Sequence, residues 1–171
     1  MKRRWHFILT MLVTSTVLAT DIGVVSFADC IARSKVGQAE QTKFETLKKQ
    51  LGSYLETTEK ELKDIASKLN DREYLDGLSP EAEAELKAKA QSLNEEMMRY
   101  QGQYYQTLNQ TNSQIVQQLG AQVASASELV AKEQKLSIIL NQEACFYRDD
   151  AVNVTDQVIH VLDELFDKKG E

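Results

Sequence analysis

Two short segments typical of β-strands lie about a hundred residues apart, and the residues between them have the spacing of long helices. The first segment is the β-branched run at residues 22–27, and the second is residues 136–140. Short strands need partners to be stable, so the two segments are expected to pair. The intervening helix must therefore go out and come back. The pattern predicts a rod closed at its base by a small sheet, which offers surface and not a catalytic pocket.

The outgoing helix has one apolar seam, with spacings of three, four and seven residues and a four-four step at Leu51. The returning helix repeats these spacings. At 1.5 Å per residue the outgoing arm, roughly residues 37–76, is about 60 Å long, and such a helix buries its apolar face only against a partner. The seam positions are Phe44, Leu47, Leu51, Leu55, Leu62, Ile65 and Leu69, then Leu86, Ala90, Leu93, Met97, Tyr100, Tyr104, Leu108, Ile115, Leu119 and Val123.

Residues 70–80 interrupt the helical pattern and mark the tip of the hairpin. Gly77 is suited to end the first helix, Ser79 to cap the second, and Pro80 to occupy its first turn. We therefore expect residues 37–133 to form one antiparallel helical arm.

The remaining residues, 20–36 and 134–171, are expected to form the body at the base of the arm. Asp29 is a candidate N-cap of a short helix that breaks at residues 34–37. After the strand at 136–140, residues 141–144 predict a turn and residues 145–148 a third strand. Asn153 or Thr155 would then cap a last helix. Such a thin sheet has open edges, which indicates that the body completes its core by association.

The amino terminus predicts a secretory signal peptide at residues 1–19. Lys2, Arg3 and Arg4 precede a short apolar run, and small residues favour cleavage between Ala19 and Thr20. The run is too short to span a bilayer, so no stable membrane insertion is expected after cleavage. Removing the three basic residues changes the net charge from −6 to −9. An acidic exported protein is a poor candidate for binding nucleic acid or anionic lipid.

Cys30 and Cys145 are the only cysteines, and both would lie at the base of the hairpin. In an oxidising compartment they could form one disulfide, or they could be two buried free thiols. Two cysteines and one mature histidine, His160, make a zinc site improbable. Glu95 and Glu96 lack the concave site that catalysis would need, and no catalytic or nucleotide motif is present. We expect neither enzymatic activity nor a cofactor.

Several segments, in order, resemble the Skp/OmpH family of periplasmic chaperones for outer-membrane proteins. They are the export segment, residues 22–27, 34–39, 136–140, 144–147 and 154–158. The resemblance covers essentially the whole mature chain. It implies a periplasmic homotrimer whose strands form a small barrel and whose helical arms enclose a cavity. Unfolded outer-membrane proteins would be held there without ATP until they reach the insertion machinery. The chain is acidic whereas well-studied members are basic, so charge-steered capture is not carried over.

The resemblance and the residue types together predict two sets of site residues. The apolar strand residues expected in the trimer core are Ile22, Val24, Ile138, Leu140 and Phe146. Apolar or aromatic residues at the tip or off the seam are expected to contact clients, and these are Tyr74, Leu75, Leu78, Met98 and Tyr105. Met97, Tyr100 and Tyr104 are expected to pack between the arms. The alternative function is a periplasmic coiled-coil spacer that links envelope components.

Overall fold

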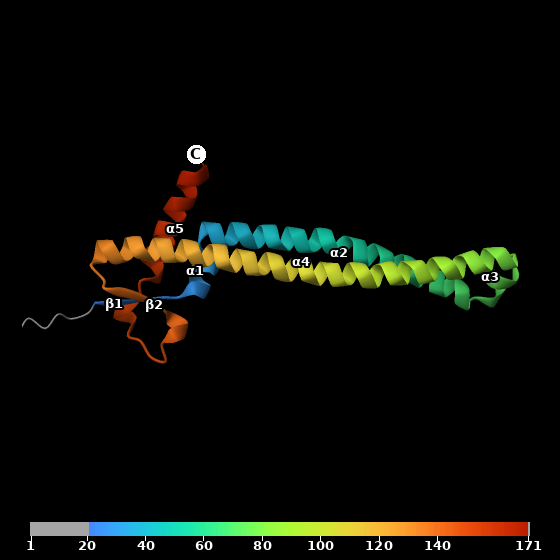
Figure 1. Ribbon diagram of the computed structural model, residues 1–171, viewed down its shortest axis with the longest axis horizontal. Coiled ribbons are helices and arrows are strands. Elements are labelled where there is room, and N and C mark those ends of the chain that lie inside the picture. The colour runs from blue at the N-terminus through green and yellow to red at the C-terminus, as the bar shows by residue number, and fades with distance from the viewer. Residues whose placement is uncertain (1–20, 171) are drawn as a thin grey trace, which may run out of the picture.

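The computed structural model describes residues 21–170, so the expected signal peptide and its cleavage site lie outside the described residues. Two long helices, α2 (Lys35–Asn70) and α4 (Pro80–Gln134), run antiparallel and form a rod that projects from a small body (Figure 1). The predicted α+β fold, a helical hairpin on a small sheet, is confirmed. Within the described residues no helix is long and apolar enough to cross a membrane.

Capping residues define the tip of the hairpin as the sequence predicts. Ser79 caps α4 by accepting a hydrogen bond from the Ala82 amide at 3.2 Å, and Pro80 is its first residue. Asp71 ends α2 and caps an additional short helix, α3 (Arg72–Asp76). Gly77 therefore ends this short helix instead of α2 itself.

The body joins a two-stranded sheet to the base of the rod. Strands β1 (Ile22–Val25) and β2 (Ile138–Asn141) pair in parallel, with Ile22 opposite Ile138 and Val24 opposite Leu140. Helix α1 (Phe27–Arg33) follows β1, and helix α5 (Thr155–Gly170) leaves the base at an angle to the rod (Figure 1). The buried apolar core is Val25, Cys30, Val36, Leu119, Val123, Ala126, Val130, Val154, Val158, Ile159 and Leu162.

A glycine allows the close crossing of α1 and α2. A Cβ built on Gly37 would lie 1.9 Å from the carbonyl oxygen of Ile31, which no side chain can tolerate. Ser34 separates the two helices, and its hydroxyl accepts a hydrogen bond from the Gly37 amide at 3.1 Å. The break predicted at residues 34–37 is thus confirmed, and the glycine determines how tightly it packs.

The predicted strand at residues 145–148 is wrong. These residues have no regular structure and lie between two 3-10 turns, η1 (Gln142–Ala144) and η2 (Asp150–Val152). The edge of β1 that faces away from β2 is used instead by a bridge between Val24 and Asn153. The Val154 amide also donates to the Val24 carbonyl at 2.9 Å. Residues 145–148 do not pair with the outer edge of β2 either, so the sheet of the described chain has two strands.

Three predicted element boundaries at the base also need correction. Ser26 caps α1, because its hydroxyl accepts a hydrogen bond from the Asp29 amide at 3.2 Å, and Asp29 itself lies in the first turn. The first strand therefore ends before Ser26. The second strand begins at Ile138 and not at Leu136, because Lys135 ends α4 in a left-handed conformation (φ 58°).

Candidate functional site

One face of the sheet carries most of the predicted trimer-core residues. Side chains alternate between the two faces of a strand, so Ile22, Val24, Ile138 and Leu140 share one face. Ile22 and Ile138 are 41% and 43% exposed, whereas Val24 is buried and Leu140 is half-buried. The structure thus brings four of the five candidates together and leaves their outer end open to solvent.

Phe146, the fifth candidate, lies in the loop after β2 and has no cover from its own chain. Its side chain is fully exposed, as is most of the neighbouring Tyr147. Two adjacent exposed aromatic residues in the loop after β2 form an apolar surface that a soluble subunit rarely leaves bare. The base therefore carries a surface suited to association.

The predicted client-contact residues fall into two separate groups. Tyr74, Leu75 and Leu78 lie at the tip, where Tyr74 is exposed and both leucines are half-buried. Met98 and Tyr105 lie on α4, and their exposed fractions are 59% and 57%. The α4 group begins eighteen residues after Pro80, about 27 Å along the helix, and so lies apart from the tip group.

The seam between the arms is sparse and partly polar. Met97, Tyr100 and Tyr104 are half-buried, in agreement with packing between the helices. The ring of Tyr100 lies 4.4 Å from that of Tyr54, centroid to centroid. The Tyr54 hydroxyl donates a 2.6 Å hydrogen bond to Glu96, and this bond raises the pKa of the Tyr54 hydroxyl. Polar and aromatic contacts therefore hold the arms together where apolar burial is small.

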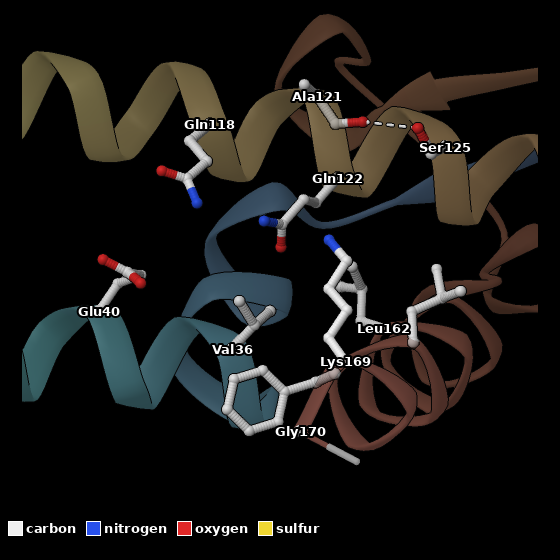
Figure 2. A pocket seen from close by; sticks show the side chains of 11 residues that line it. Val36, Glu40, Gln118, Ala121, Gln122, Ser125, Leu162, Lys169 and Gly170 are labelled. Atoms are coloured by element: carbon white, nitrogen blue, oxygen red, sulfur yellow. Dashed lines mark hydrogen bonds between the residues drawn. The ribbon is translucent and has the colours of Figure 1, made fainter.

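A groove of about 710 Å³ lies where α5 meets α2 and α4. Figure 2 shows Val36 and Glu40 on the α2 side of this groove, Gln118 and Gln122 on the α4 side, and the Lys169 side chain reaching in between them. Its remaining lining is mainly apolar or amide, and it holds no nucleophile with an adjacent base. The lining of the groove therefore has no arrangement suited to nucleophilic catalysis.

Ion pairs fasten α5 to the start of the arm. The Lys35 ammonium lies 2.6 Å from the Asp167 carboxylate, and this hydrogen bond raises the pKa of Lys35. The backbone amide of Lys35 also donates to Asp163 at 2.7 Å, and Arg33 pairs with Asp156 at 2.7 Å. The carboxylates of α5 thus cover the amino-terminal end of α2, where the helix dipole favours negative charge.

Both cysteines are free thiols, so the structure contains no bridge between Cys30 and Cys145. Cys30 is fully buried on α1 within the core cluster, whereas Cys145 is half-buried in the loop after β2. Burial raises the pKa of the Cys30 thiol to about 11, and the nearby Asp29 carboxylate adds to the effect. Among the described residues no group of three or more His, Cys, Asp or Glu side chains is placed to hold a metal ion.

Sequence reasoning missed two exposed apolar residues on the returning arm, Val116 and Leu129, whose exposed fractions are 45% and 47%. Val116 lies next to Ile115, which the apolar spacing places on the seam. Because consecutive residues of a helix are about 100° apart, a seam position at Ile115 already implies an outward Val116. Helical phase, and not hydrophobicity alone, was the signal that could have identified Val116.

Comparison with known proteins shows matches over nearly the whole chain. A family profile described as outer membrane protein (OmpH-like) matches residues 21–162. The chain is 39% identical over 170 residues to a Skp-like protein of Chlamydia muridarum, covering 97% of this chain and 98% of the relative. It is 36% identical over 164 residues to a Skp-like protein of Chlamydia pneumoniae, covering 96% and 95%.

A solved structure shares the fold. It is the crystal structure of an OmpH-like protein from Caulobacter crescentus, assigned as an outer membrane chaperone. The TM-score is 0.71 at 22% sequence identity, and the match covers 85% of each chain. At this identity the likeness establishes the architecture of hairpin and base.

Proposed function

Because the chain belongs to the OmpH-like family of outer membrane proteins, we propose that it is a chaperone that holds unfolded outer-membrane β-barrel proteins. The holding is passive, requires no ATP, and involves no enzymatic step. The single observation that carries the proposal is a long helical hairpin with few buried residues, standing on a base whose apolar surface is uncovered. Such a molecule provides extended surface without an enclosed site, as a holder of unfolded chains requires.

The proposal includes a homotrimer joined through the base. Ile22, Ile138 and Phe146 are exposed on each subunit, and β2 has a strand partner on one side only. A closed three-fold ring would cover these apolar side chains and the open strand edge, which otherwise favours uncontrolled association. Three arms projecting from one base would then surround a cavity.

The proposed location is the periplasm, where clients arrive unfolded after export. There the chaperone would release them to the outer-membrane insertion machinery. The family to which the chain belongs and its basic, apolar amino-terminal segment support this location. Delivery requires reversible binding, and surface contacts spread along an open arm release more readily than a deep pocket.

The test is dilution of a urea-unfolded outer-membrane β-barrel protein into buffer with the mature protein, followed by sedimentation. We expect a trimer that keeps the client soluble at near-equimolar ratio of trimer to client. A spacer protein would leave the client to aggregate and would bind a folded partner instead. A monomer that gives no protection contradicts the proposal.

A further inference from the structure

The returning helix contains a long stretch without any charged residue. Between Arg99 and Glu128, residues 100–127 include no Asp, Glu, Lys, Arg or His. At 1.5 Å per residue this stretch is about 42 Å long, the length of about twelve residues of extended chain. Charges lie on either side of it. Residues 64–96 have nine acidic and four basic side chains, and residues 132–170 have eight acidic and five basic ones.

Five exposed residues form one line along α4, from Met98, just before this stretch, to Val116 within it. Met98, Tyr105 and Val116 are separated by seven and eleven residues, each close to a whole number of helical turns, and Asn109 and Asn112 lie on the same line between them. We call these five residues the neutral stripe. Tyr104, on the seam, meets the Tyr105 ring edge to face at 5.2 Å and so supports its position.

The same line of α4 leads to a groove at the sheet. This groove, of about 450 Å³, is lined by Gly120, Val123 and Ser127 of α4 and by residues of both strands, including Ile138. The hydroxyl oxygen of Ser127 is buried there and has no hydrogen-bond partner within the described chain. A buried hydroxyl without a partner is costly, so a polar group from outside the subunit is expected to satisfy it.

The amides beside the stripe are also free. No side-chain amide between residues 101 and 122 has a hydrogen-bond partner in the described part of the chain. Each amide offers both a donor and an acceptor, which match the alternating N–H and C=O groups of a polypeptide backbone. An uncharged surface also requires no particular charge on the molecule that it binds.

We propose that the neutral stripe and the groove at its base bind an extended segment of an unfolded polypeptide, through apolar contacts at Met98, Tyr105 and Val116 and amide contacts to its backbone. This inference rests on the proposed chaperone function and names the surface that performs it. It places binding on the part of α4 that runs from Met98 to the groove at the sheet, and not at the acidic tip. A second copy of the chain fits less well, because a stripe can pair with itself only across a two-fold axis, which a trimer lacks.

A photoreactive amino acid at position 105 tests which molecule occupies the stripe. The matched control is position 103, which is also exposed and lies about 200° away around the helix. With a urea-unfolded outer-membrane β-barrel protein as probe, position 105 should crosslink to the probe severalfold more than position 103. Equal yields at both positions, or crosslinks mainly between copies of the chain, would overturn the proposal.

Charge insertion tests whether the stripe contributes affinity. The triple variant Met98→Glu, Tyr105→Glu and Val116→Glu should lower probe affinity by about tenfold, because each contact would desolvate a carboxylate. The control variant Gln103→Glu with Gln114→Glu should bind as the wild type does, with the oligomeric state of both variants checked by sedimentation. Wild-type affinity should change by less than about twofold between about 0.05 and 0.5 M salt.

The outcomes separate this inference from the proposed function. A wild-type protein that fails to hold the probe contradicts the chaperone function itself. A wild type that holds the probe while the triple variant holds it equally well contradicts the stripe alone. A large loss of wild-type affinity with salt also contradicts the stripe, because charged surfaces would then carry the binding.

Discussion

The base and the arm of this molecule are stabilised by different kinds of packing. At the base, four buried residues of α4 (Leu119, Val123, Ala126 and Val130) pack against α1 and α5. Farther out, the fully buried residues of α2 are Thr58 and Ile65, and one of these is polar. The base is thus a small globular core, whereas the arm is a two-helix strip with solvent on most sides. The strip therefore leaves most of its surface exposed, and the buried core of the base stabilises the fold.

The largest expected difference concerns glycines. Gly37→Ala at the base should destabilise the protein by about 3 kcal/mol, because the new Cβ would lie 1.9 Å from the Ile31 carbonyl oxygen and backbone must move. Urea unfolding at fixed protomer concentration measures the change. A loss below about 1 kcal/mol would show that α1 and α2 can separate easily, and the description of the base as a tight core would fail.

Leucines on one helix give the next comparison. Leu119→Ala should cost about 3 kcal/mol, because Leu119 is buried at the base and its removal leaves a cavity. Leu108 lies eleven residues earlier on the same side of α4 but is half-buried. Leu108→Ala should therefore cost about 1 kcal/mol. Equal losses in thermal or urea unfolding would remove the distinction between base and arm.

The pH dependence of stability tests burial at Cys30. The thiol has a pKa of about 11 in the folded protein and an ordinary value of 9.0, so the unfolded chain loses this proton first as pH rises. Stability should fall between about pH 9 and 11, by an amount on the order of 2 kcal/mol from this group. Cys30→Ala should have a shallower fall over this range than the wild type. Identical slopes would contradict a buried thiol.

The accessibility of the two cysteines provides a control for the preceding comparison. In the native protein at pH 8, Cys145 should react with a thiol reagent, whereas Cys30 should react only after denaturation. Labelling of denatured protein that requires prior reduction would show that the two are bridged.

The arm could be predicted from sequence because its signal is long and local. Seam spacings over dozens of residues determine both helices, and Ser79 and Pro80 locate the turn by capping chemistry. Met98 and Tyr105 lie off the apolar seam in the helical repeat, and the repeat therefore also predicted that both side chains are exposed. These features depend on neighbours within a few residues, so a single sequence contains them.

The base could be predicted only in outline, because its pairing is decided by distant residues. Residues 145–148 have the composition of a strand, but it is Asn153 that bridges to β1, and residues 145–148 stay outside the sheet. Ser26 caps α1, and its backbone amide also donates a 2.9 Å hydrogen bond to the Thr155 hydroxyl, which helps to fix the position of the cap. Contacts between residues more than a hundred positions apart leave no local pattern in the sequence.

The smallest expected effect has the opposite sign and lies in the arm. A Cβ added at Gly52 or Gly102 would meet nothing within 4 Å, so Gly→Ala there should stabilise the helix by about 0.5–1 kcal/mol. These two glycines lie near the Tyr54–Tyr100 contact, where α2 and α4 face each other. Hydrogen exchange of nearby amides should slow in Gly52→Ala together with Gly102→Ala, with exchange at the base unchanged. Destabilisation instead would mean that the arm is as tightly packed as the base, because only close neighbours could make an added methyl group unfavourable.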